Sequence, residues 1–346
     1  MLSVLALGCR SGPELPRARP EPAARLTEPS VLCLEQQPRG PCLPAARVEG
    51  WLEDPALTIV GVHEAPAGEQ GAKVFTLQVP SEAGPIVFRA KWRTGGYNGT
   101  RRELGAHVVQ TMFLEPHEYV VPPASGHCFE LAHYRRWVDP EAEPTFPGIR
   151  CVHGVLQYWL ENAQTLPEAE EAGWFNWSEG ALFDAALWER DRTYRDSLAH
   201  VNLLSHLIDH ADTHWAQFLI VADPATPRVY GVDNSLSFGA RQNPGLRLHD
   251  WSRIKVPALP GATIERLRSL GDRLDRLSVL EQFARRDDGV LVEEEARPPA
   301  APGDRGYYFV EGKLKARLEQ AEIDGLRARL EALLARVDGG EIELYR

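Results

Sequence analysis

The chain has 346 residues, of which 43% are hydrophobic and 25% charged, and its formal net charge at pH 7 is -11. This is the composition of an ordinary globular protein, long enough for one large core or a two-lobed domain. The acidic balance argues against a nucleic-acid partner, because nucleic-acid-binding proteins present a basic surface to the phosphate backbone. No stretch reaches the roughly 18 apolar residues of a membrane-spanning helix.

Residues 1–30 are predicted to precede the folded domain. Met1 to Gly8 is apolar, and the small Gly8 before Cys9 resembles the end of a bacterial lipoprotein signal, whose cysteine is lipidated after cleavage. The proline- and alanine-rich segment that follows suits a tether. We therefore expect a lipoprotein-type signal and tether, a membrane contact only through a lipid anchor at Cys9, and a cell-envelope location, lipid-anchored or periplasmic. The alternative is a cytoplasmic protein with a chance apolar start, because no basic residue precedes the apolar run.

Four further cysteines are present, Cys33, Cys42, Cys128 and Cys151. None lies in a C-x-x-C pair or in a zinc-binding pattern, which argues against a metal site built on them. Their even number suits an oxidising compartment, with Cys33 and Cys42 as the expected local bridge. Four buried thiols are the alternative.

The first half of the domain is predicted to be rich in strands. β-branched or alternating runs, separated by turns that contain glycine or proline, indicate an antiparallel meander, with a helix after its third strand. We expect strands over residues 57–60, 73–79, 86–92, 128–137 and 152–160, and a helix over residues 100–113.

The second half is predicted to be mainly helical. Apolar stripes at helical spacing indicate helices within residues 180–209, 264–280 and 323–337. An acidic loop is expected over residues 165–179, two short strands over 218–221 and 228–232, and an acidic, proline-rich loop over 293–306. The whole is an α+β fold over residues 31–345, with a β-rich N-lobe at about 50–160 and a helical C-lobe at about 161–345.

One pair of charged residues suits phosphoryl transfer. That chemistry needs a cation on the phosphates, a carboxylate that fixes this cation, ligands for a metal ion and a residue that orients the acceptor hydroxyl. Lys91 closes the third strand and Glu103 lies on the helix after it, with a glycine-rich loop over residues 94–100 between them. That loop either turns tightly or offers backbone N–H groups to phosphate. A solvated lysine and a solvent-facing glutamate are the alternative.

Two later segments carry the remaining candidates. Asp212, His214 and Gln217 follow a long helix, and Asp233 stands at the end of a strand. Asp212 is expected to orient the acceptor hydroxyl, with His214 as a second catalytic residue, while Asp233 and Gln217 are expected to bind a metal ion. The alternative is a pair of turn aspartates that cap neighbouring backbone groups.

These segments resemble motifs of known kinases. Residues 212–217, Asp-Thr-His-Trp-Ala-Gln, look like the D-R-H-x-x-N loop of the phosphatidylinositol 3-/4-kinase superfamily. Residues 232–238 resemble the D-N-G-x-x-F metal motif of that group and of the secretory-pathway casein-type kinases. Residues 102–106 are similar to the helix that carries the lysine partner, and residues 154–161 to the strand before the adenine hinge. The resemblance spans roughly residues 55–285.

The resemblance implies a two-lobed protein-kinase-like fold that binds ATP with Mg²⁺ or Mn²⁺. It adds Gln157 and Glu161 to Lys91 and Glu103 as nucleotide-binding residues. The implied function is an ATP-dependent phosphotransferase. Its first expected acceptor is a hydroxyl of a protein, and its second a hydroxyl of a carbohydrate or lipid.

The sequence departs from these motifs at three positions. Thr213 replaces the usual arginine, Gln217 the usual asparagine and Ser235 the usual glycine. These changes favour an alternative, a pseudokinase that binds a nucleotide or a partner in the cell envelope without turnover. A scaffold that uses its tryptophans as a partner surface is a third possibility.

Overall fold

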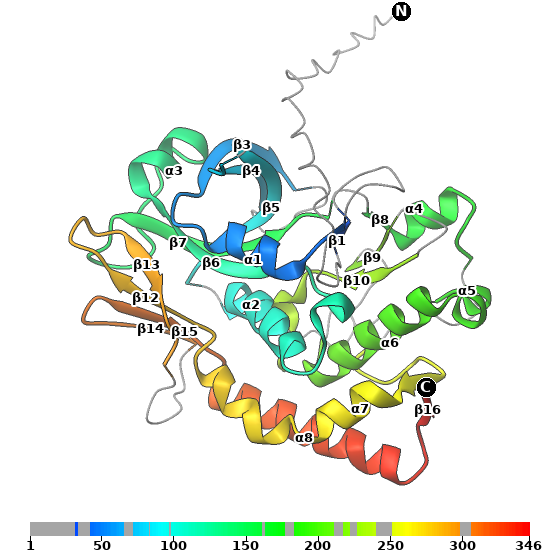
Figure 1. Cartoon of the computed structure of the whole chain (residues 1–346). Helices are drawn as coiled ribbons and strands as arrows, with labels where there is room; N and C mark the ends of the chain where they lie inside the picture. Colours follow the sequence, from blue (N-terminus) through cyan, green and yellow to red (C-terminus); the bar gives the residue numbers. More distant parts are fainter. Residues whose placement is uncertain are drawn as a thin grey trace, which may run out of the picture.

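The computed structural model describes residues 32–33, 42–65, 72–82, 84–96, 98–160, 163–176, 183–210, 217–221, 227–239, 251–297 and 306–346. Within these ranges the fold is mixed α+β, with antiparallel sheets and helices (Figure 1). Cys9, Glu161, Asp212 and His214, named above as candidates, lie outside the described residues.

A five-stranded antiparallel sheet forms the first half and confirms the predicted meander. Its strands stand in the order β3-β4-β5-β7-β6. Their bounds are β3 (Thr58–Glu64), β4 (Lys73–Val79), β5 (Ile86–Thr94), β6 (Ala124–Glu130) and β7 (Cys151–Tyr158). One face carries a cluster of aromatic rings in which Trp92 stacks on Phe75 and donates its Nε1–H to the Tyr134 hydroxyl at 3.1 Å.

Four short elements surround this sheet. They are α1 (Ala45–Glu53), α2 (Asn98–Thr111), the 3-10 turn η1 (Pro116–Glu118) and α3 (Leu131–Trp137). Helix α2 confirms the predicted helix. The strand expected over residues 128–137 is wrong beyond Glu130, where α3 begins. A helix places Tyr134 over the aromatic face of the sheet and leaves Arg135 and Arg136 in solvent.

The middle of the chain packs against α2 and lies below the five-stranded sheet in the view of Figure 1. It contains β8 (Ala163–Thr165), α4 (Leu166–Glu171), α5 (Ala185–Arg190), α6 (Arg192–Leu207), β9 (Phe218–Val221), β10 (Val229–Gly231) and the 3-10 turn η3 (Asn234–Leu236). Strands β10, β9 and β8 form a small sheet, which confirms the two short strands. The acidic segment expected as a loop contains α4, because Thr165 and Glu168 form a capping box that starts a helix.

The C-terminal part corrects a second expectation. Its elements are β11 (Ala258–Pro260), α7 (Gly261–Arg268), the 3-10 helix η4 (Gly271–Ser278), β12 (Glu281–Arg285), β13 (Leu291–Glu294), β14 (Tyr307–Val310), β15 (Lys313–Ala316), α8 (Gln320–Asp338) and β16 (Glu343–Tyr345). The helices agree with the apolar stripes, but residues 281–316 contain a four-stranded sheet in the order β13-β12-β15-β14. Phe283 of β12, Leu291 of β13 and Leu314 of β15 belong to a second, smaller core.

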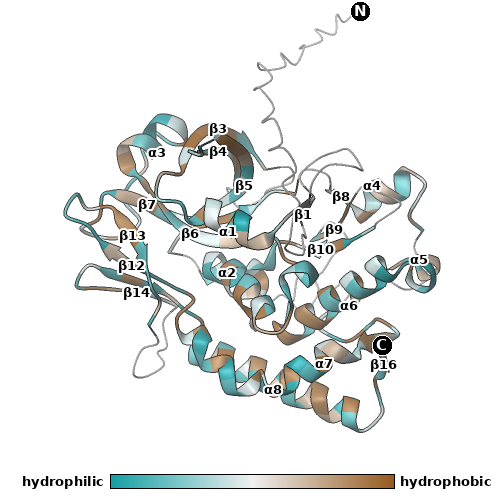
Figure 2. Cartoon of the chain, viewed as in Figure 1, coloured by the Kyte–Doolittle hydropathy of each residue, from teal (hydrophilic) through white to brown (hydrophobic). Residues whose placement is uncertain are grey.

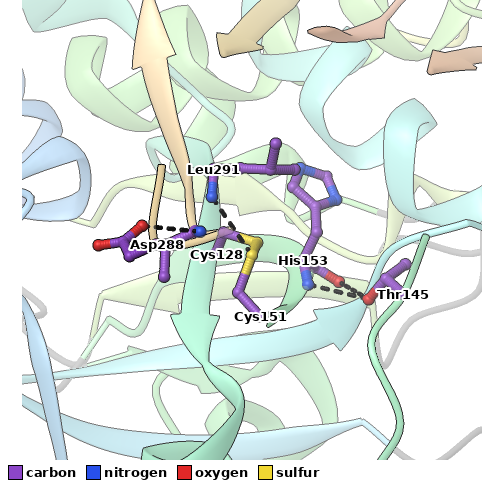
Figure 3. The surroundings of a disulfide bond; sticks show 7 residues. Cys128, Thr145, Cys151, His153, Asp288 and Leu291 are labelled. Carbon is purple, nitrogen blue, oxygen red and sulfur yellow. Dashed lines mark hydrogen bonds between the residues drawn. A yellow bond between two sulfur atoms is a disulfide. The ribbon is translucent and has the colours of Figure 1, made fainter. Parts of the chain in front are cut away.

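A disulfide joins Cys128 on β6 to Cys151 on β7, with their Cα atoms 5.5 Å apart (Figure 3). It belongs to the second core, where the Leu291 N–H contacts the Cys151 sulfur at 3.4 Å. Strands β1 (Leu32–Cys33) and β2 (Cys42–Leu43) pair so that Cys33 stands opposite Cys42. Directly paired strand residues have Cα atoms about 4.5–5.5 Å apart, within reach of a bridge, which stays a prediction.

The main core continues from the sheet to the C-terminal helices. It includes Phe75 and Trp92 of the sheet, Leu204 of α6 and Leu330 of α8. Hydrophobic residues alternate with hydrophilic ones along α6 and α8 (Figure 2), as expected of helices with one buried face. Among the described residues, no helix combines the length and the apolar character that crossing a membrane requires.

Candidate functional site

Strand β5 presents two cations on the face of the sheet opposite its aromatic cluster. Alternation along the strand buries Ala90 and Trp92 in the core and turns Lys91 and Arg93 the other way. Helix α2 lies against this second face and brings Glu103 to it, while the chain leaving β10 brings Asp233. Two consecutive elements, β5 and α2, therefore meet the distant segment after β10 at one place.

Lys91 lies between two carboxylates. Its Nζ is 3.4 Å from Glu103 Oε1 and 3.3 Å from Asp233 Oδ1. The predicted ion pair between Lys91 and Glu103 is thus confirmed, and Asp233 converges on the same ammonium group. The Lys91 side chain is only 16% exposed, so this contact is little screened by solvent.

Arg93 is a second cation at Asp233. Its Nη2 is 2.7 Å from Asp233 Oδ1, closer than Lys91, and the Ser235 hydroxyl donates to the same oxygen at 3.2 Å. Arg93 was not among the residues singled out from the sequence. The signal that identifies it is strand alternation, because a residue two positions after Lys91 must share its face.

Glu103 ties helix α2 to the segment after β10. Its side chain is 3% exposed, and Oε2 accepts a hydrogen bond from the Asn234 N–H at 2.9 Å. Burial raises the pKa of Glu103 above its ordinary value, although Lys91 acts in the opposite direction. The carboxylate is thus held by two donors from two different elements.

Asp233 has a backbone conformation that is uncommon for a residue with a side chain. Its φ and ψ are 59° and 54°, in the left-handed region. The His210 Nε2–H donates to the Asp233 carbonyl oxygen at 3.1 Å and helps to hold this conformation. Such strained residues cluster at functional sites, because the surrounding structure must maintain them.

The charge of Asp233 is stabilised by its two cations. Burial alone would favour the neutral acid, but Lys91 and Arg93 outweigh it and hold the pKa of Asp233 well below its usual range. Asp233 is therefore a carboxylate at all physiological pH values, with 34% of its side chain exposed.

The two glutamine candidates occupy different positions. Gln157 pairs with Lys91 across β5 and β7, so its side chain shares the face of Lys91. It is 4% exposed, and its Nε2 has no hydrogen-bond partner among the described residues. Gln217 is buried just before β9, and its carbonyl accepts the Val232 N–H at 2.9 Å, one residue before Asp233.

The glycine-rich loop after β5 turns tightly. Gly95 donates its N–H to the His153 carbonyl at 2.7 Å, and a Cβ at Gly95 would lie 2.4 Å from the His153 ring. Gly96 has a φ of +90°, and the Thr100 hydroxyl closes the turn by donating to the Thr94 carbonyl at 2.9 Å. The N–H of Gly95 is therefore used inside the fold, and the glycines serve a close approach to β7.

A buried ion network fixes the N-terminal end of α2. The guanidinium of Arg101 is fully buried and contacts Glu322 and Glu319 at the start of α8, the latter at 2.8 Å. Arg102 reaches Glu322 at 2.8 Å. Because Glu103 is the next residue along α2, these contacts fix the position from which its carboxylate reaches Lys91.

The donor set suits a cation that arrives with a phosphorylated ligand. Among the described residues no group of three or more His, Cys, Asp or Glu side chains is placed to hold a metal ion by itself. Mg²⁺ usually keeps several waters and is held by one or two carboxylates together with phosphate oxygens. Asp233, partly exposed, is a ligand of that kind, and Gln217, whose backbone carbonyl accepts the Val232 N–H, carries an amide oxygen as a second possible donor.

Lys91, Glu103 and Asp233 are brought into direct contact, and Gln157 lies beside Lys91 on the neighbouring strand. Comparison of this sequence with protein-family models and with curated proteins finds no match. The function of the site is therefore inferred from its geometry.

Proposed function

We propose that this protein is an ATP-dependent phosphotransferase with a two-lobed, protein-kinase-like arrangement, and that its acceptor is a hydroxyl of a protein. The observation that supports this most is the position of Lys91, whose ammonium group joins Glu103 on α2 to Asp233 after β10. A strand lysine fixed by a helix glutamate, facing an acid at the end of a later strand, supplies the charges that phosphoryl transfer needs.

In this proposal each residue has one role. Lys91 binds the α- and β-phosphates of ATP, and Glu103 holds Lys91 in place. Asp233 and Gln217 bind Mg²⁺ or Mn²⁺, which when present neutralises charge that develops on the phosphates. Gln157 and Glu161 line the nucleotide on the β7 side. Asp212 orients the acceptor hydroxyl, with His214 next to it.

A pseudokinase is the second candidate, and one contact favours it. Asp233 Oδ1 already accepts from Lys91, Arg93 and Ser235, so a metal ion must compete with two cations for this oxygen. Ser235 stands where the related motif has glycine, and its hydroxyl makes one of these contacts. A protein of this kind would bind a nucleotide or a partner without phosphate transfer.

An oxidising compartment is part of the proposal. The Cys128–Cys151 disulfide supports it, because such bonds persist where the surroundings are oxidising. We propose a location in the cell envelope, lipid-anchored at Cys9 or periplasmic. Labelling of the full chain with a radioactive fatty acid, with Cys9→Ser as control, tests the anchor.

Nucleotide binding is the first experiment. A ligand at 100 times its Kd stabilises a protein by about 2.7 kcal/mol, so thermal unfolding with ATP and Mg²⁺ or Mn²⁺ should show a clear shift. The shift should vanish in Lys91→Met and remain in the matched control Lys73→Met. Lys73 lies on β4 and pairs with Glu64 of β3 at 3.0 Å. Absence of any shift in the wild type would refute the nucleotide site.

Phosphate transfer separates the two candidates. The protein is incubated with ATP labelled at the γ-phosphate and with peptides that contain serine, threonine or tyrosine. Incorporation that Asp212→Asn and Asp233→Asn abolish supports the phosphotransferase. Binding of ATP without incorporation, in the presence of either metal, supports the pseudokinase.

A further inference from the structure

We infer that Arg93 is a second phosphate-binding cation, which holds Asp233 in the ligand-free protein and moves to a phosphate oxygen when nucleotide binds. This inference rests on the proposed function and adds a residue to it. Arg93 lies two positions after Lys91 on β5, and both cations reach the same oxygen, Asp233 Oδ1.

The side chains of the site balance one another in charge. Two cations, Lys91 and Arg93, face two carboxylates, Glu103 and Asp233. The phosphates of a nucleotide add several negative charges and compete with the carboxylates for these cations. A metal ion that arrives with the nucleotide compensates only part of that charge.

Arg93 is the cation better placed to leave Asp233. Lys91 is also held by the buried Glu103, whereas among the described residues the ion pair of Arg93 goes to Asp233 alone. Asp233 is 34% exposed, so an entering ligand can reach the contact that Arg93 makes. Movement of Arg93 therefore breaks one ion pair and leaves the Lys91–Glu103 pair intact.

The guanidinium group also has an unused donor. Arg93 Nε is shielded from solvent and has no hydrogen-bond partner among the described residues. A buried donor without a partner is costly, and this cost is removed if a ligand oxygen accepts from it. Arginine binds phosphate oxygens in a planar, two-point geometry that lysine lacks.

The exchange has a consequence for the metal. When Arg93 leaves Asp233 Oδ1, that oxygen becomes available to Mg²⁺ or Mn²⁺, which competes with Arg93 in the ligand-free protein. Nucleotide phosphate and metal ion should therefore favour each other's binding through Arg93. Removal of its charge should weaken nucleotide binding and strengthen metal binding to the ligand-free protein.

Calorimetric titration of the full chain with ATP, in EDTA and in MgCl₂, tests this. Arg93→Gln should lower ATP affinity in EDTA by about tenfold or more, the effect of losing a hydrogen bond to a charged group. Arg93→Lys keeps the charge and should lose less. Mn²⁺ binding without nucleotide, followed by electron paramagnetic resonance, should tighten in Arg93→Gln. The control Arg268→Gln breaks an Arg–Asp pair of the same 2.7 Å length far from the site and should change neither affinity.

The outcomes separate this inference from the proposed function. If the wild type binds ATP and Arg93→Gln binds it equally well or more tightly, Arg93 is not a phosphate ligand and the inference is wrong, while the proposed function stands. If the wild type binds no ATP with or without metal, the proposed function fails and the inference with it. Should Arg93→Gln unfold, the Arg93→Lys variant carries the same comparison, and equal affinity there overturns the inference.

Discussion

Two groups of charged side chains border the five-stranded sheet, and they differ in how their charges are matched. The charged site combines two cations with two carboxylates, namely Lys91, Arg93, Glu103 and Asp233. Its members come from β5, α2 and the chain after β10, and the closest contact is 2.7 Å. At Asp233 the effect of burial is offset by two partners of opposite charge, while at Glu103 burial still outweighs Lys91.

The second group, the acidic interface, joins carboxyl groups of like charge, namely Glu53, Glu281 and Glu293. Glu281 is 6% exposed, and its Oε1 accepts a hydrogen bond from the Gly126 N–H of β6. Burial, and then the neighbouring Glu293, raise the pKa of Glu281 to about 8. Partners decide how far burial is offset: Lys91 and Arg93 hold the pKa of Asp233 below its usual range, whereas Glu281 has carboxyl groups as its charged neighbours and its pKa is raised.

The largest effect is expected when the charged site loses its central cation. Lys91→Met leaves the buried Glu103 without its ion-pair partner and should lower the free energy of unfolding by about 3–5 kcal/mol. Urea denaturation at pH 8 measures this. Adding Glu103→Gln should restore part of the loss, because it removes the unpaired charge. The control Lys73→Met breaks an exposed pair with Glu64 on the same sheet. Equal losses of unfolding free energy in Lys91→Met and Lys73→Met would contradict the stabilising role of the buried Lys91–Glu103 pair.

The disulfide next to the acidic interface should have the second largest effect. Cys128 and Cys151 are 23 positions apart, and a bond that closes a loop of this size stabilises by about 3 kcal/mol. The double variant Cys128→Ser/Cys151→Ser should lose about this much in urea, and the wild type should lose the same on reduction. Mass spectrometry after alkylation with and without reductant checks the bond itself. Equal labelling in both cases would refute it.

The sequence predicts these two regions to different degrees. The meander was predictable because Lys73–Val79 is rich in apolar residues and Ile86–Thr94 alternates, and the order of Lys91, Glu103 and Asp233 along the chain indicated one site. Strands β12–β15 were not, because each is four or five residues long, and β12, β13 and β15 also contain charged residues. A short run of this kind carries little periodicity.

Tertiary contacts explain the other features that the sequence did not predict. Helix α3 replaced an expected strand because Tyr134 packs on Phe75 and Trp92, which no local pattern encodes. The Cys128–Cys151 bond could not be chosen from spacing, since four cysteines allow several pairings. Alternation along the strand could have placed Arg93 on the face of Lys91. From the sequence alone, however, an arginine on a strand cannot be told from a solvent-exposed one, because its partner Asp233 is distant in the chain.

The stability of the protein should depend on pH through Glu281 of the acidic interface. The pKa of Glu281 in the folded protein, about 8, lies above its ordinary value of 4.5. The folded state therefore binds more protons than the unfolded chain between these values, and the free energy of unfolding falls as pH rises through this window. Glu281→Gln keeps an acceptor for the Gly126 N–H and cannot ionise. It should stabilise the protein at pH 8 by at least about 1.4 kcal/mol, the equivalent of one pKa unit, and leave pH 5 almost unchanged.

Denaturation curves at pH 5, 6.5 and 8 measure this effect. Glu294→Gln serves as the control, because Glu294 is at the surface, where it pairs with Lys313 at 2.9 Å, and its pKa is lowered by that lysine. Its replacement should not stabilise the protein at any of these pH values. If Glu281→Gln loses stability equally at pH 5 and pH 8, the carboxyl of Glu281 is not held neutral by the fold.

The smallest effect is expected for an ion pair that matches the charged site in length but not in surroundings. Arg268 and Asp338 lie 2.7 Å apart, as Arg93 and Asp233 do, but their side chains are 38% and 58% exposed. Solvent and salt screen such a pair, and ordering two long side chains opposes it. Arg268→Gln should therefore leave the urea midpoint within experimental error, and added salt should erase any difference that remains. Because the contact distance is the same, a large destabilisation by Arg268→Gln would mean that pair length rather than burial sets the energetics of both pairs, and the contrast between the charged site and the rest of the surface would fall.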